Sequence, residues 1–144
     1  MTVPLRFRNL DIDPNSPVDH WGFEGLSSAI ERGNLDDWRR IVNEIRHTPY
    51  GAVASDLDDA LSVANGKGGA PFLARALSDA RTGPGATVAR RMRHDVRRTG
   101  LTLRQFAAFL GTSHSRLSTY LAGSVTPSAA IAVKSARLGA EHRI

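Results

Sequence analysis

The sequence of 144 residues contains no cysteine and no long uninterrupted apolar segment. Without thiols the chain has no disulfide, no thiolate nucleophile and no cysteine-ligated zinc site, so a reducing cytoplasm is the compartment we expect. No stretch reaches the roughly 18 apolar residues that a transmembrane helix requires. The first residues also lack the continuous apolar core of a secretory signal. These absences predict a cytoplasmic protein with no membrane partner.

Strand patterns are missing as well, because apolar and polar residues nowhere alternate over the length of a strand. Apolar residues recur instead at intervals of three and four, which is the spacing of one helix face. A chain of about 150 residues buries roughly two-thirds of its unfolded surface, which is enough for a self-sufficient core. We therefore predict an all-α protein, with an N-terminal helical domain followed by a second helical domain.

Acidic residues are scarce in the C-terminal part of the chain. Residues 85–144 contain 10 basic and only 2 acidic side chains, whereas residues 1–84 contain 9 basic and 12 acidic ones. A basic module beside a slightly acidic one is typical of proteins that bind a polyanion, because each neutralised phosphate releases a condensed counterion. We expect residues 85–144 to bind the polyanion.

The N-terminal part divides into an arm and a helical domain. Residues 1–20 hold three prolines and no helical periodicity, so we expect an extended or disordered arm. Residues 21–84 predict four helices and a flexible loop at residues 65–69. The best-signalled helix starts at Asn34 as N-cap, and its expected inward residues are Leu35, Trp38, Ile41, Val42 and Ile45. Being near neutral, this domain is predicted to mediate dimerisation or to bind a protein partner.

The C-terminal part predicts four more helices. After the interruption at residues 82–85, one helix runs from about residue 86 to residue 99 and carries five arginines. Two short helices follow, the first capped by Thr102 and ending at Gly111, the second capped by Ser113 and ending at Gly123. A last helix is expected from Pro127 or Ser128 to about Leu138, because proline is favoured at the first position of a helix.

Residues 88–138 resemble the helix-turn-helix of the Cro/C1-type repressor family. The residues that carry the resemblance align with the family pattern without gaps. They are Leu101-Thr102, Phe106-Ala107, Leu110-Gly111, Ser113, Leu117, Gly123 and Thr126-Pro127-Ser128. Independently of the family, Ala107 is small where two helices must approach closely, and Gly111 suits a tight turn. The resemblance implies that residues 85–144 form a DNA-binding domain whose second short helix enters the major groove.

The candidate DNA-binding residues follow from that placement. Leu117 and Leu121 fix the inward face of the second short helix, so the opposite face is available to base edges. By the family pattern, His114, Ser115 and Thr119 occupy positions that usually face bases, and Arg116 has the fork that reads guanine. Many relatives carry a polar residue where this chain has Leu103, so we expect Arg104 to replace that contact. The full predicted set is Thr102, Arg104, Ser113, His114, Ser115, Arg116, Ser118, Thr119 and Ser128.

Other chemistry finds no support in the sequence. The segment at residues 65–69, NGKGG, lacks the preceding strand, the full spacing and the hydroxyl residue of a phosphate-binding loop. Asp11, Asp13 and Asn15 start like a calcium loop, but the glycine and the final glutamate of that loop are missing. The five histidines are scattered. We therefore predict no catalytic site, no metal site and no cofactor.

Two functions remain open at this point. The first is a sequence-specific transcriptional regulator, expected to be a repressor, that binds a double-stranded operator as a homodimer. The second is an antitoxin that neutralises a partner toxin through its N-terminal domain and represses its own operon. The protein encoded by the neighbouring gene distinguishes the two.

Overall fold

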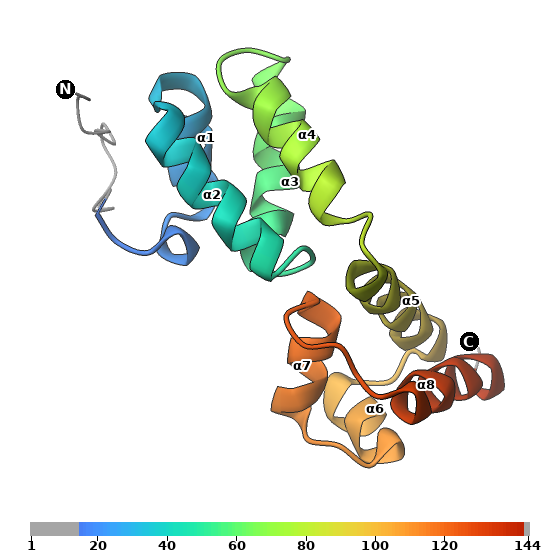
Figure 1. The fold of residues 1–144 in the computed structure, drawn as a ribbon. Helices are drawn as coiled ribbons and strands as arrows, with labels where there is room; N and C mark the ends of the chain where they lie inside the picture. Colours follow the sequence, from blue (N-terminus) through green and yellow to red (C-terminus); the bar gives the residue numbers. More distant parts are fainter. Residues whose placement is uncertain (1–14, 143–144) are drawn as a thin grey trace. The chain divides into compact units, whose positions relative to one another are not determined.

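The computed structural model describes residues 15–142, and every regular element among them is helical. The predicted all-α class is therefore confirmed for this part of the chain. The chain divides into two compact units, residues 1–81 and residues 82–144 (Figure 1). Unit 1 contains a short 3-10 helix, η1 (Val18–His20), and four α-helices: α1 (Gly22–Arg32), α2 (Leu35–His47), α3 (Ala52–Ala64) and α4 (Ala70–Ala80).

The core of unit 1 lies where α1 packs on α3 and α2 packs on α4. Its largest fully buried side chains are Trp21, Leu26, Ile30, Ile41, Ile45, Leu57 and Leu73. The arm predicted for residues 1–20 is wrong at its C-terminal end, because residues 18–20 form η1 and Val18 is buried. Trp21 holds this segment in place, since the residue is 1% exposed and its Nε1–H donates to the Ser16 carbonyl at 3.1 Å. Residues 1–14 lie outside the described residues.

Helix α2 begins with the expected cap. The Asn34 side chain accepts from the Asp37 N–H at 3.1 Å, and the Asp37 carboxylate accepts from the Asn34 N–H at 3.0 Å. Ile41, Val42 and Ile45 are buried as predicted, but Leu35 is 45% exposed because it lies at the edge of that face, at the first helical residue. The cap at Asn34 thus sets the start of α2, and the buried residues of its later turns hold it against the core.

The glycine-rich loop at residues 65–69 is held in place rather than free. The Gly69 N–H donates to the Ile30 carbonyl at 2.9 Å, which ties the loop to the end of α1. A Cβ at Gly69 would lie 2.4 Å from the ring of Trp38, and Gly68 has φ +58°. The glycines therefore serve close packing, which the prediction of a flexible loop missed.

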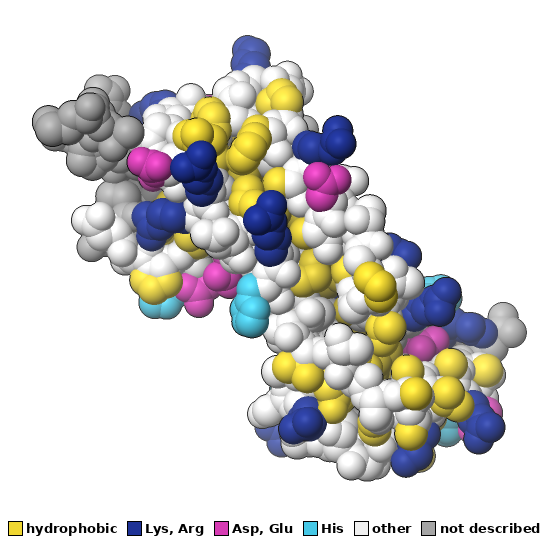
Figure 2. All heavy atoms as spheres, viewed as in Figure 1, with side chains coloured by type: hydrophobic (Ala, Val, Ile, Leu, Met, Phe, Trp, Pro, Cys, Tyr) yellow, Lys and Arg dark blue, Asp and Glu magenta, His cyan; other side chains and the backbone are white. Residues whose placement is uncertain are grey.

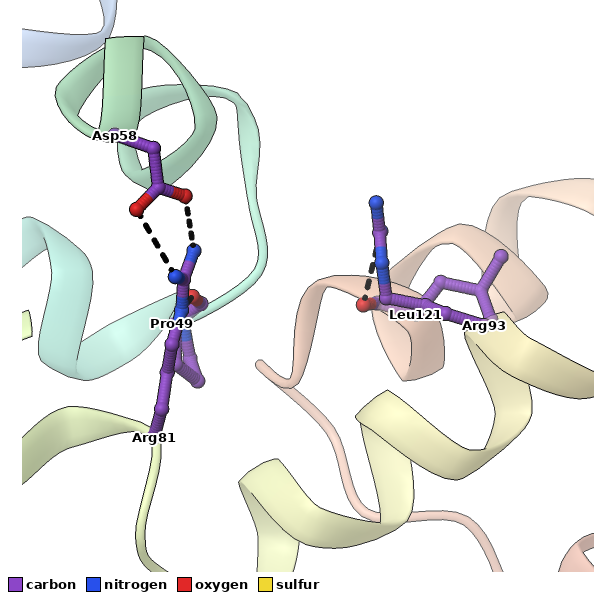
Figure 3. Close-up of polar contacts among 5 residues, drawn as sticks. All are labelled: Pro49, Asp58, Arg81, Arg93 and Leu121. Atoms are coloured by element: carbon purple, nitrogen blue, oxygen red, sulfur yellow. Dashed lines mark hydrogen bonds and ion pairs between the residues drawn. The ribbon is translucent and has the colours of Figure 1, made fainter. Parts of the chain in front are cut away.

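The side chain of Arg81, the last residue of unit 1, makes three hydrogen bonds. Arg81 follows α4, and its two Nη atoms donate to the Asp58 carboxylate at 3.2 and 2.9 Å. Its Nε–H donates to the Pro49 carbonyl at 2.8 Å (Figure 3). The bidentate pair fixes the end of α4 to α3, and the bond to Pro49 fixes it to the turn before α3.

Unit 2 contains the four remaining helices, α5 (Pro84–Thr99), α6 (Leu103–Leu110), α7 (His114–Ala122) and α8 (Ala129–Glu141). The predicted interruption at residues 82–85 is shorter in the structure, because Gly83 is the N-cap and Pro84 is the first residue of α5. Helix α5 packs on α8 and α7, and α6 packs on α7 and α8. The buried cluster comprises Met92, Phe106, Ala107, Leu110, Leu117, Tyr120, Leu121 and Leu138.

A buried polar contact joins α5 to α8. The Ser135 hydroxyl, which is fully buried, donates to the Asp95 carboxylate at 2.8 Å. The two helices also approach closely at Gly139, where a Cβ would lie 3.0 Å from the Asp95 Oδ1 atom. Asp95 is thus a structural partner of α8. Between residues 15 and 142, no helix is long and apolar enough to cross a bilayer.

Candidate nucleic-acid interface

The turn between α6 and α7 is built by local signals. Thr102 and Gln105 form a reciprocal cap at the start of α6, with bonds of 3.1 and 2.9 Å. Gly111 then ends α6 at φ +76°, and Gly123 ends α7 at φ +83°, conformations that disfavour a side chain. Ala107 is 1% exposed where the helices cross. These features confirm the predicted positions of the two short helices.

Helix α7 has a buried face and an exposed face. Leu117, Tyr120 and Leu121 are buried, while the predicted site residues of this helix lie on the remaining surface. His114, Ser115, Arg116 and Ser118 are exposed, and Thr119 is half-buried. The sequence therefore identified which side of α7 faces outward.

Four of the predicted residues line one hollow on this face. Ser113, Ser115, Arg116 and Thr119 surround a shallow cavity of about 390 Å³, together with Val125. His114 and Ser118 lie outside it, and the Ser118 hydroxyl donates to the His114 carbonyl at 3.1 Å. The hollow combines hydroxyls, one guanidinium and an apolar wall, which are the groups that recognise base edges and thymine methyls.

Val125 is a member of this surface that sequence reasoning missed. It is 42% exposed in the segment after α7, and its N–H donates to the Thr119 carbonyl at 3.4 Å. Ser124 ties the same segment to α7, since its hydroxyl also donates to Thr119, at 3.2 Å. An apolar residue between Gly123 and Pro127 was the available signal, but only folding places it beside Thr119.

The hydroxyls on α7 are already oriented by their own helix. The Thr119 hydroxyl donates to the Arg116 carbonyl at 2.6 Å, and Ser113 Oγ accepts from the Arg116 N–H at 3.0 Å. Thr119 therefore offers a ligand its acceptor lone pairs and its methyl group, whereas the Ser113 proton stays available to an acceptor such as a phosphate. Arg116 is also held, because its Nε–H donates to the Tyr120 hydroxyl at 2.9 Å.

The other predicted residues lie outside the hollow, at the starts of α6 and α8. Thr102 and Ser128 are N-caps, and Ser128 accepts from the Ile131 N–H at 3.2 Å. Arg104 is exposed in the first turn of α6. Leu103 beside it packs against the buried cluster of unit 2, which gives its apolar character a structural reason.

The arginines of α5 divide between two sides of that helix. Arg93 and Arg97 border a hollow with Leu103 of α6 and Leu121 of α7. The Arg93 Nη1 donates to the Leu121 carbonyl at 3.4 Å and so supports the C-terminal end of α7 (Figure 3). Arg90 and Arg91 line a separate groove with Ala132, Val133 and Ala136 of α8. These four arginines of α5 are therefore not equivalent.

Within the described part of the chain, no group of three or more His, Cys, Asp or Glu residues could hold a metal ion. The chemistry that the surface offers is hydrogen bonding and positive charge, from α5, α6 and α7.

Comparison with known proteins agrees with this geometry. Residues 86–138, which span α5 to α8, match a family described as a helix-turn-helix domain, and the resemblance expected from residues 88–138 is confirmed. Comparisons with curated proteins and with solved structures gave no significant match. Helix-turn-helix domains are DNA-binding modules in which the second helix of the motif enters the major groove, the position that α7 holds here. Residues 86–138 of this chain thus form a helix-turn-helix domain of the Cro/C1 type, which makes it a candidate DNA-binding regulator.

Proposed function

We propose that the protein is a sequence-specific DNA-binding transcriptional repressor that binds its operator as a homodimer. In this proposal α7 enters the major groove and the hollow formed by Ser113, Ser115, Arg116, Thr119 and Val125 reads base edges. A single helix-turn-helix makes few contacts, so two copies on half-sites about 34 Å apart supply the affinity. The cytoplasm is the proposed location, because the protein must meet DNA there.

The observation that carries the proposal is the composition of the exposed face of α7. Its side chains are short apart from His114 and Arg116, so the backbone of α7 can approach a groove floor closely. Arg104, near the start of α6, and Arg97, beside Leu121 of α7, add positive charge close to the same motif. The positive charge of these arginines favours binding to DNA phosphates whatever the base sequence. The exposed face of α7 supplies the selectivity for a particular base sequence.

In vitro selection with the full chain and a random duplex pool tests this proposal. We expect enrichment of a recurrent half-site. Thr119→Ala should then lower discrimination between the selected and a random duplex by about 1–3 kcal/mol, because it removes an acceptor and a methyl from the reading face. Ser62→Ala, in α3 of unit 1, is the matched control, since it also removes an exposed hydroxyl that donates to its own helix, at 2.7 Å.

Two results would contradict the proposal. A duplex pool that remains random after selection would contradict sequence-specific binding. An equal effect of Thr119→Ala and Ser62→Ala on discrimination would contradict the proposed role of α7 in reading bases. The sign of regulation is tested separately with a reporter gene behind the selected site. Repression predicts lower expression when the protein is present.

An antitoxin is the second candidate, and apolar side chains exposed on unit 1 favour it. Leu35, Val63 and Phe72 are 45%, 60% and 44% exposed, and the Phe72 ring lies 6.1 Å from that of Trp38. Hydrophobic side chains gather over α2 and α4 in Figure 2. Exposed apolar side chains that lie together are typical of a protein-binding surface.

Co-expression with the neighbouring gene tests this candidate. An antitoxin should co-purify with that gene product and suppress its toxicity. Phe72→Glu should weaken the complex, while Phe109→Glu, which also changes an exposed phenylalanine but in unit 2, should leave it intact. If the product of the neighbouring gene is neither toxic nor bound by this protein, transcriptional repression remains as the proposed function.

A further inference from the structure

Arg116 has a neutral side-chain partner on its own helix. Its Nε–H donates to the hydroxyl of Tyr120, four residues later, at 2.9 Å. Residues at this spacing lie on adjacent positions of one helix face. The Tyr120 ring is embedded in the core, and the whole residue is 5% exposed. The hydroxyl is thus a fixed acceptor placed at the boundary between the core and the recognition surface.

The bond determines which edge of the guanidinium remains available. Guanidinium has five N–H donors in one plane, and a bidentate partner uses two parallel donors of one edge. Because Nε–H is taken by Tyr120, the edge formed by Nε and its neighbouring Nη is occupied. The terminal edge, with one donor from each Nη, remains complete. Arg116 lines the hollow together with Thr119 and Val125, so this edge belongs to the proposed reading surface.

We propose that Tyr120 is a positioning residue that presets Arg116 to read a guanine through its two terminal nitrogens. Guanine presents O6 and N7 as two acceptors on its major-groove edge, which matches the spacing of those donors. Holding the side chain before binding reduces the conformational entropy lost on binding. The inference rests on the proposed function, since it assigns one residue pair within the same DNA-binding surface.

Tyr120→Phe isolates the hydroxyl, because it keeps the buried ring and removes only the acceptor. The full chain and this variant are compared by in vitro selection and by titration against the selected duplex and a random duplex. We expect Tyr120→Phe to bind the selected duplex about tenfold more weakly and the random duplex unchanged within about twofold. The guanine preference should relax at one position of each half-site. Tyr50→Phe, which changes the other tyrosine of the chain and lies in unit 1, is the matched control and should leave both affinities unchanged.

A double-mutant cycle with Arg116→Ala tests that Tyr120 acts through Arg116. The double variant should bind the selected duplex no more weakly than Arg116→Ala alone. Arg116→Lys should lose the guanine preference as well, because an ammonium cannot make the bidentate pair. The Arg116 Nε–H proton, followed by NMR in the free protein, should exchange with water faster in Tyr120→Phe. This readout does not depend on DNA.

The outcomes separate this inference from the proposed function. If the wild-type chain enriches no sequence, both are wrong. If it enriches a site that Tyr120→Phe recognises equally well, or if the effects of Tyr120→Phe and Arg116→Ala add, the positioning role is wrong and the proposed function stands. An equal loss on both duplexes would assign Arg116 to a phosphate and would also overturn the inference. Thermal unfolding of Tyr120→Phe confirms that the variant compared is folded.

Discussion

Single side chains in unit 2 combine capping with the chemistry proposed for DNA binding. Ser113 and Ser128 each accept a backbone N–H with their hydroxyl oxygen, which leaves the hydroxyl proton for another acceptor. A serine in this position stabilises the start of its helix whether or not DNA is present. Replacing one of them therefore changes stability as well as affinity, so neither is a clean test of DNA contact. Thr119 and Tyr120 are better choices, because neither is an N-cap.

The buried bond between α5 and α8 predicts a large effect from a small substitution. Ser135→Ala should lower the free energy of unfolding by about 1–3 kcal/mol, because it leaves the buried Asp95 carboxylate without the hydroxyl that it accepts from. Ser118→Ala is the control, since its hydroxyl is exposed and the expected change is within about 0.5 kcal/mol. Urea unfolding measures both. Equal midpoints for the two variants would show that Asp95 does not depend on Ser135.

At the level of helices, the sequence was sufficient to predict several helix ends but not the contacts between helices. The caps at Asn34, Thr102 and Ser113 and the glycines after α6 and α7 act over three or four residues, so the sequence alone located those helix ends. The contacts between Asp95 and Ser135 and between Arg93 and Leu121 join residues 40 and 28 positions apart, and no local pattern contains them. The same holds for Val125, which reaches the hollow only after the chain turns at Gly123.

Within α5, position on the helix decides what each arginine contributes. Arg97→Ala should weaken binding to selected and random duplexes alike and reduce the slope of log affinity against log salt by about 1, because Arg97 lies beside α6 and α7. Arg91→Ala is the matched control. Its side chain lines the groove against α8, so the slope should not change. Fluorescence anisotropy at several salt concentrations measures this, and equal slopes in both variants would argue against a directional phosphate surface.

The whole molecule consists of two units, each with its own buried cluster. The proposed division of labour predicts that residues 82–144 alone bind the selected half-site with steep salt dependence, because they contain the basic charge and the complete motif. Duplex binding by residues 1–81, with none by residues 82–144, would reverse the assignment. Circular dichroism of each fragment checks that it is folded before binding is compared.

Self-association is one of the two roles predicted for unit 1, the other being the binding of a protein partner. We expect the full chain to sediment as a dimer and residues 82–144 to sediment as a monomer at the same concentration, because the exposed apolar residues of α2 and α4 are then absent. If the full chain is monomeric and binds no product of the neighbouring gene, unit 1 has a different role. Binding of a small effector by unit 1 would then be the hypothesis to test.

The placement of tryptophan provides a built-in optical probe. The chain has two tryptophans, Trp21 and Trp38, and both belong to unit 1. Trp21 is fully buried and Trp38 is half-buried, so the emission of both should shift when unit 1 unfolds. Selective excitation of tryptophan therefore follows unit 1, whereas the helical circular dichroism signal follows both units. Comparing the two signals during one denaturation reveals whether the units melt together, with no label attached to the protein.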